Sequence, residues 1–212
     1  MALKVELVDV SATLKQRHGW QMKELLITLF LCILLPVHVH GTEGDWSVTL
    51  YGGPYVDTPL MRISSFTTKP DFVGSGMTTL AVSKEFTRWG KYVAWELEGQ
   101  VAKHFVLQDH WELNGALVMR WLPFPWDEYL DTSFAIGDGV SFATEAPELE
   151  GGPDDDVRKV VNFLLLEFGF ALPDVPHWSV IVRLHHRSNM YGVYPGENGG
   201  SNFLCFGTRY TF

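Results

Sequence analysis

The sequence predicts an all-β fold in which eight antiparallel strands close into a transmembrane barrel. Eight segments alternate apolar side chains with polar or small ones, as β-strands do because successive side chains point to opposite faces. The apolar face is crowded with Trp, Phe and Leu, which makes it too bulky for the narrow interior of an eight-stranded barrel. We therefore expect the apolar face to contact lipid and the polar face to line the lumen.

The alternation places the strands along the chain. Segment 111–121 sorts most cleanly, with Leu117 on the apolar face and Arg120 on the polar one. The predicted strands are 46–51, 77–86, 92–103, 111–121, 131–144 and 162–172, and two more in the hairpin 178–212. Segment 55–76 is rich in turn-forming residues and segment 145–159 is acidic, so both predict long loops.

Charged residues of the polar face are expected inside the barrel, where opposite charges pair. This set comprises Glu85, Glu96, Glu98, Glu112, Glu167, Arg120, Arg183 and Arg209. An eight-stranded barrel leaves almost no channel once side chains fill its interior, so a pore is the less favoured function.

Composition and charge argue against nucleic-acid binding, and the sequence shows no metal or cofactor motif. The chain has 212 residues, which fits one domain, and a net charge of −9. Phosphate binding requires clustered Lys and Arg, so an acidic chain with no basic block is not expected to bind nucleic acid. His104 and His110 are isolated in the sequence, and we predict neither a metal site nor a cofactor.

The N-terminal segment is typical of an export signal. An apolar run from Leu25 to Val37 follows Lys23, and residues small enough for cleavage before Thr42 come after it. The sequence therefore predicts an N-terminal extension and signal peptide at 1–41 and a barrel at 42–212.

Two features of this segment stay open. Met22 is an alternative start to Met1, and an anchor helix is the alternative to a signal, although the apolar run is shorter than a bilayer span. If the signal is removed, Cys205 is the remaining cysteine and no intramolecular disulfide is expected.

The last strand has a pattern of its own. Counting back from Phe212 in steps of two gives Tyr210, Thr208, Phe206 and Leu204, a largely apolar face with an aromatic end. This pattern resembles the closing strand of bacterial outer-membrane β-barrels, and the resemblance implies the bacterial outer membrane as the location. The alternative is the last strand of a soluble sheet.

Loop lengths indicate the orientation of the barrel. Connections after the second, fourth and sixth predicted strands are short, whereas those after the first and fifth are long. Outer-membrane barrels have short periplasmic turns and longer external loops. We therefore expect the seventh strand to reach the outer leaflet near 186–191.

Three residues at the end of the seventh strand carry candidate chemistry. His186 and Ser188 continue the lipid-facing parity of Leu184, and their backbones lie about 6.6 Å apart. A Ser hydroxyl becomes a nucleophile when a base such as a His ring takes its proton. Asn189 is placed to donate a hydrogen bond to a developing oxyanion. The alternative is that these polar residues only mark where the strand leaves the hydrocarbon.

The pattern His186-Arg187-Ser188-Asn189 near the end of an eight-stranded barrel resembles the lipid A 3-O-deacylases and the wider group of acyloxyacyl-hydrolase-like barrel proteins. The resemblance implies a carboxylic ester hydrolase with Ser188 as nucleophile, His186 as base and Asn189 at the oxyanion. It also implies lipopolysaccharide, through its lipid A, as the substrate among the outer-membrane lipids.

The chain departs from this family at one position. The family orients its His with a Glu on the final strand, and this chain has Gly200, Ser201 and Asn202 there. Glu197, in the turn before that strand, is one candidate for the orienting role, and Asn202 is the other. Loss of the orienting carboxylate costs triad enzymes orders of magnitude in rate. A non-catalytic structural or lipid-binding barrel is therefore the competing function, and whether the barrel forms a homodimer stays open.

Overall fold

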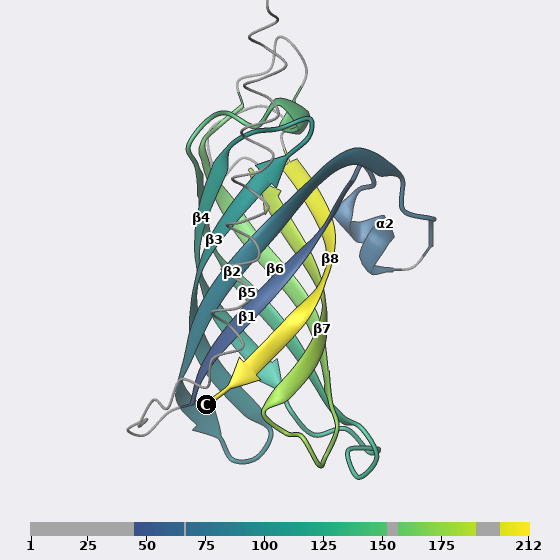
Figure 1. Ribbon diagram of the computed structural model, residues 1–212, viewed down its shortest axis with the longest axis vertical. Coiled ribbons are helices and arrows are strands. Elements are labelled where there is room, and N and C mark those ends of the chain that lie inside the picture. Colours follow the sequence, from purple (N-terminus) through teal and green to yellow (C-terminus); the bar gives the residue numbers. More distant parts are fainter. Residues whose placement is uncertain (1–44, 66, 152–156, 190–199) are drawn as a thin grey trace, which may run out of the picture. The chain divides into compact units, whose positions relative to one another are not determined.

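The computed structural model describes residues 45–65, 67–151, 157–189 and 200–212. They form a closed barrel in which each strand pairs antiparallel with its chain neighbours and β1 pairs with β8 (Figure 1). The strands are β1 (Trp46–Val56), β2 (Phe72–Trp89), β3 (Val93–Phe105), β4 (Trp111–Trp121), β5 (Asp131–Ala143), β6 (Val160–Ala171), β7 (Trp178–Ser188) and β8 (Gly200–Thr211). A short helix, α2 (Leu60–Ser64), follows β1, and a 3-10 helix, η1 (Glu148–Glu150), precedes β6. The predicted eight-stranded antiparallel barrel is confirmed.

The two ends of the barrel differ in the segments they carry. Asp45 and Phe212 lie at the terminal end, where Phe212 N donates to the carbonyl of Trp46. The connections after β2, β4 and β6 lie at the same end. The opposite end, where β1, β3, β5 and β7 finish, is the loop end.

Two strands are longer than the sequence predicts. β1 continues through Gly52–Pro54, where it stays paired with β2, and the register of the two strands shifts between Pro54 and Tyr55. A Cβ on Gly53 would lie 2.0 Å from the carbonyl oxygen of Leu204, so this glycine permits close approach of β8 rather than a turn. The predicted loop 55–76 is therefore wrong at both ends, and the connection between the strands spans 57–71.

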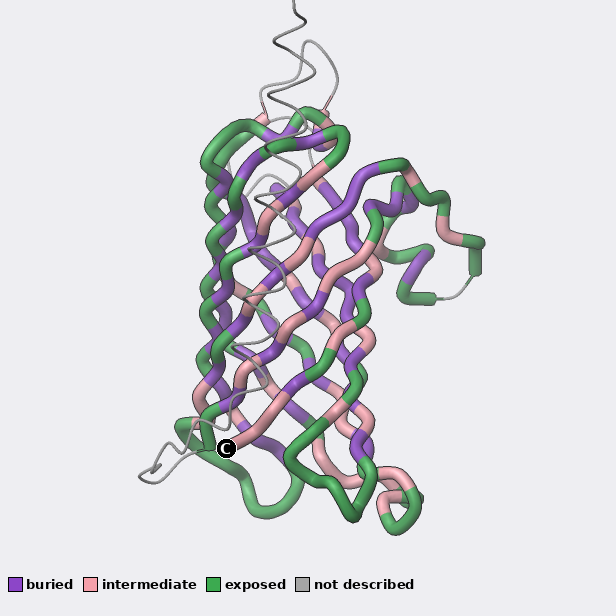
Figure 2. Tube along the Cα trace, viewed as in Figure 1, coloured by how far each residue is buried: buried purple, intermediate pink, exposed green. Residues whose placement is uncertain are grey.

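Buried and exposed residues alternate along the strands, as the colours of Figure 2 show. Leu117 and Phe168 are 44% and 41% exposed on the outside, whereas Glu112 and Glu167 on the same two strands are fully buried. A closed barrel pairs its backbone groups between strands, so an apolar wall of this kind is stable in hydrocarbon. The prediction that the apolar face points outward is confirmed.

Ion pairs fill the middle of the interior. Arg183 donates to Glu98 and to Glu167, each at 2.7 Å. Arg120 bridges Glu167 at 2.9 Å and Glu96 at 2.8 Å. The predicted interior residues that are buried are Glu96, Glu98, Glu112, Glu167, Arg120, Arg183 and Arg209. Each guanidinium meets carboxylates, which offsets the cost of removing these charges from water.

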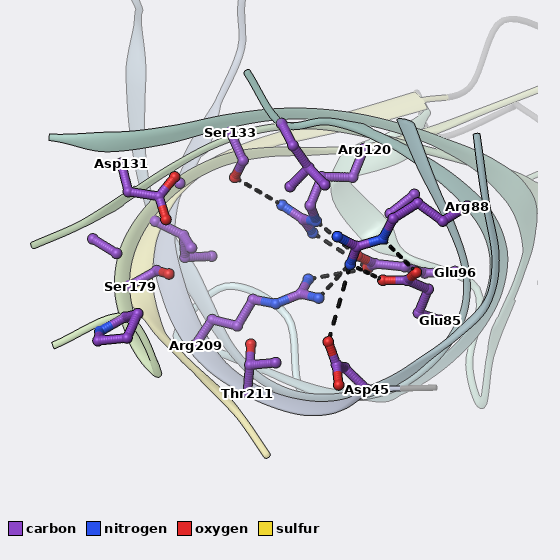
Figure 3. A pocket seen from close by; sticks show the side chains of 16 residues that line it. Asp45, Glu85, Arg88, Glu96, Arg120, Asp131, Ser133, Ser179, Arg209 and Thr211 are labelled. Atoms are coloured by element: carbon purple, nitrogen blue, oxygen red, sulfur yellow. Dashed lines mark hydrogen bonds and ion pairs between the residues drawn. The ribbon is translucent and has the colours of Figure 1, made fainter. Parts of the chain in front are cut away.

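Ion pairs also bound the interior at its two ends. A polar cavity of about 130 Å³ at the terminal end is lined by Glu85 and by the ion pair between Arg209 and Glu96 (Figure 3). At the loop end, Glu150 of η1 is buried and lies 3.2 Å from Arg187. The lumen between these ends is occupied by side chains.

The connection 57–71 packs against the outside of the barrel, and Figure 1 shows α2 beside β8. Ile63 of α2 forms a buried cluster with Val56 and with Leu184 of β7. Leu60, Leu166 and Leu204 pack against this cluster. Part of the lipid-facing wall of β6, β7 and β8 is therefore covered by protein. Among the described residues, no helix is long and apolar enough to cross a bilayer.

Candidate active site on the outer wall

Two of the predicted site residues lie on the outer wall near the loop end. His186 and Ser188 point outward from β7 with the parity of Val180, and both are partly buried. Ser188 lies opposite Asn162 of β6 and Gly200 of β8. The shared face expected from strand alternation is present in the structure.

Asn202 of β8 lies opposite His186 and holds its ring. The Nδ2 of Asn202 donates to the carbonyl oxygen of Thr58 at 3.0 Å, and its Oδ1 lies 2.7 Å from His186 Nδ1. A carbonyl oxygen only accepts, so the amide nitrogen must face Thr58 and the amide oxygen must face His186. Since that amide oxygen also only accepts, His186 Nδ1 carries the proton and donates it.

This arrangement fixes the tautomer of the neutral ring. With its proton on Nδ1, His186 keeps a lone pair on Nε2, and that nitrogen is the base that a serine nucleophile requires. Of the two orienting residues left open by the sequence, the structure shows Asn202 in contact with His186. Glu197 lies outside the described residues.

The carbonyl that fixes Asn202 comes from the connection packed on the wall. The hydroxyl of Thr58 accepts from Asp71 N at 3.0 Å, and Asp57 N donates to the carbonyl of Asp71 at 2.8 Å. These bonds tie together the two ends of the 57–71 connection. Sequence reasoning missed this contribution because a backbone carbonyl leaves no signal in residue types.

Ser188 and Asn189 complete the predicted group at the end of β7. In the part of the chain that the structure describes, Ser188 Oγ and His186 Nε2 do not hydrogen-bond to each other. Apo catalytic bonds are often long, and rotation about the Ser Cα–Cβ bond moves the hydroxyl. Asn189 is buried and directly follows β7.

A second polar pair extends the site across the wall. Asp138 points outward from the middle of β5 and is exposed. Asn162, which lies opposite Ser188, donates to Asp138 at 2.9 Å and to the carbonyl of Gly139 at 3.1 Å. The parity of Ile136 already placed Asp138 on this face, so the sequence carried this signal.

The outward row that contains Ser188 has little side-chain bulk. Following the strand pairing, the row runs through Gly99, Gly115, Val140, Asn162, Ser188 and Gly200. A Cβ added to Gly99 or Gly115 would meet no atom within 4 Å. This row therefore combines hydrogen-bonding groups on β6 and β7 with open space outside β3 and β4.

The fold of this chain is similar to those of solved outer-membrane barrels. No protein-family model and no curated protein matches the chain. Among solved structures, it is similar to the outer membrane enzyme PagL, with 13% identity, 76% of this chain and 97% of that chain covered, and a TM-score of 0.53. It is also similar to Neisserial surface protein A, with 9% identity, 79% and 97% coverage, and a TM-score of 0.49. The closed eight-stranded fold, the apolar wall and the charged interior make this chain a β-barrel of the bacterial outer membrane.

Proposed function

We propose that this barrel is a serine esterase that hydrolyses an acyl ester of lipopolysaccharide in the outer leaflet, the activity that its resemblance to the lipid A deacylases implies. The observation that supports this most is the chain of hydrogen bonds from Thr58 through Asn202 to His186. It leaves a base on the face that carries Ser188. Ser188 is then the nucleophile, His186 the general base and Asn202 the positioning residue.

The proposed reaction proceeds in two halves. Ser188 Oγ attacks the ester carbonyl carbon while its proton passes to His186 Nε2, and the proton then leaves with the alcohol of the broken ester. Water attacks the acyl-Ser188 intermediate by the same proton route and releases a fatty acid. Asn189 donates to the oxyanion in both halves. Because Asn202 is neutral, it fixes the ring without the charge stabilisation that a carboxylate adds.

The position of the site supports a lipid substrate. Ser188 is partly exposed on the outer wall of the barrel. An ester within the outer leaflet therefore reaches it without leaving the membrane. The 57–71 connection beside the site carries exposed Arg62 and Lys69, with Asp57 and Asp71 at its two ends. Cationic side chains at the headgroup level attract anionic lipids such as lipopolysaccharide.

Mass spectrometry of lipid A tests this proposal. Cells that express the protein are expected to lose one hydroxyacyl chain from lipid A, and cells that express Ser188→Ala are expected to keep it. Ser179→Ala is the matched control, because Ser179 lies at the other end of β7 and lines the terminal cavity. Lipid A that is unchanged by a folded, membrane-inserted wild-type barrel would contradict the esterase.

Two observations favour the competing function, a non-catalytic structural or lipid-binding barrel. An amide stands where the resembling family has a carboxylate, and Ser188 does not hydrogen-bond to His186 in this structure. In that case Asp138, Asn162 and Ser188 would bind lipid headgroups without cleaving them. The lipid A measurement separates the two functions.

We also infer that residues 1–41 direct export and are removed. An apolar run of this length, with a basic residue before it and small residues after it, fits a cleaved signal rather than a bilayer span. N-terminal sequencing of the protein purified from outer membranes is expected to begin at Thr42. A first residue of Met1 or Met22 would show that the segment is retained.

A further inference from the structure

A second group of chemically active side chains lies inside the barrel at the loop end. His104 at the end of β3 and His110 before β4 are both buried, and their rings stack with centroids 4.2 Å apart. The backbone bond from His104 N to the carbonyl of His110, 3.1 Å long, closes this hairpin and brings the two residues together. The expectation that these histidines are isolated is therefore wrong, because hairpin pairing makes them neighbours.

Glu112 of β4 connects this pair to the rest of the interior. Its Oε2 lies 2.7 Å from His104 Nε2, and its Oε1 lies 2.8 Å from His185 Nε2. A carboxylate accepts, so both of these ring nitrogens carry protons. The lone pair of neutral His104 then lies on Nδ1.

Two buried ring nitrogens in this group have no partner. His104 Nδ1 and His110 Nε2 are inaccessible to water and make no hydrogen bond among the described residues. A buried polar atom that forms no hydrogen bond destabilises the fold, so each of these nitrogens calls for a partner. The cluster thus holds two ring nitrogens that form no hydrogen bond in the described part of the chain.

We propose that His104, His110 and Glu112 bind a divalent transition metal ion such as Zn²⁺. One ligand atom from each residue lies within 4.8 Å of the other two, and a pair of imidazoles with a carboxylate is a donor set that Zn²⁺ takes. One ring nitrogen of His104, one ring nitrogen of His110 and one carboxylate oxygen of Glu112 form this donor set.

The surroundings favour a cation and allow the ligands to close. Near this cluster, the carboxylates of Glu112, Glu150 and Asp109 outnumber the cationic groups of Arg187 and Lys103. Ligand atoms of a tetrahedral Zn²⁺ lie about 3.4 Å apart, so the present group must contract. His110 lies in the connection between β3 and β4, so contraction of the group at His110 need not disturb strand pairing. This site is independent of the proposed esterase.

Metal titration of the refolded full-length protein, without an affinity tag, tests the site. The protein is expected to bind one equivalent of Zn²⁺ by calorimetry and to give the visible absorption of tetrahedral Co²⁺. His110→Gln is expected to weaken Zn²⁺ binding at least about 10-fold and to abolish the Co²⁺ spectrum. Gel mobility with and without heating confirms that each barrel is folded.

His177→Gln provides the matched control, because His177 is exposed and lies in the turn between β6 and β7 at the terminal end. It is expected to bind Zn²⁺ like the wild type. A folded wild-type barrel that binds no Zn²⁺ would overturn the proposal, and so would binding that His110→Gln leaves unchanged. The Co²⁺ spectrum of the wild type decides the matter even if the variant does not fold.

Discussion

Replacing Asn202 with Leu is expected to lower the kcat of the proposed esterase about 10²–10⁴-fold and to change KM little. The side-chain amide fixes the proton of His186 on Nδ1, and Leu leaves the ring free to place that proton on Nε2, where it blocks the base. Substrate does not contact Asn202 in this proposal, so its binding is spared. Steady-state kinetics on lipid A in mixed micelles measures both constants.

The variant Asn202→Asp separates positioning from mere packing. Its carboxylate still accepts from His186 Nδ1 and preserves the tautomer, although the second oxygen now faces the Thr58 carbonyl in place of a donor. We expect it to retain at least about 10-fold more activity than Asn202→Leu. Equal activity in the two variants would contradict the role given to Asn202. A larger loss in Glu197→Gln than in Asn202→Leu would assign that role to Glu197.

Replacing Arg183 with Ala is expected to lower the free energy of unfolding by about 3–5 kcal/mol. The guanidinium is fully buried between Glu98 and Glu167, and it lies 4.6 Å from the ring centroid of Tyr51. Its removal leaves carboxylates in the interior with fewer positive partners. Urea unfolding in lipid vesicles, followed by Trp fluorescence, measures the change.

Arg88→Ala is the control for this experiment. Arg88 pairs with Glu85 at the rim of the terminal cavity, where its side chain is 41% exposed, so its loss is expected to cost less than about 1 kcal/mol. Failure of Arg183→Ala to fold, while Arg88→Ala folds, is the extreme form of the expected result. Equal stability of the two variants would show that the interior ion pairs contribute little.

Strand parity predicted the faces of this barrel correctly because period-two alternation is a local property of the chain. Leu117 lies outside and Arg120 inside for that reason. The extent of β1 was not predictable in the same way. The Gly52–Pro54 segment has the composition of a turn, but Gly53 is needed where β8 approaches closely, and that contact involves residues about 150 positions away.

The candidate site was likewise predictable only where strand alternation decides it. The outward direction of His186 and Ser188 followed from parity, and so did the placement of Asn202 on their face. The Thr58 carbonyl that orients Asn202 depends on how the 57–71 connection packs on the wall, and no residue pattern encodes that. The group of His104, His110 and Glu112 was missed because sequence separation was considered without the pairing of β3 with β4.

Labelling with a lipophilic fluorophosphonate tests most directly whether the outer wall carries a working Ser–His pair. The refolded barrel in micelles is expected to gain one phosphonyl group, and peptide mass spectrometry is expected to place it on Ser188. Labelling is expected to be absent in Ser188→Ala and slowed in Asn202→Leu. A folded barrel that stays unlabelled, or that is labelled equally in Ser188→Ala, would contradict the account.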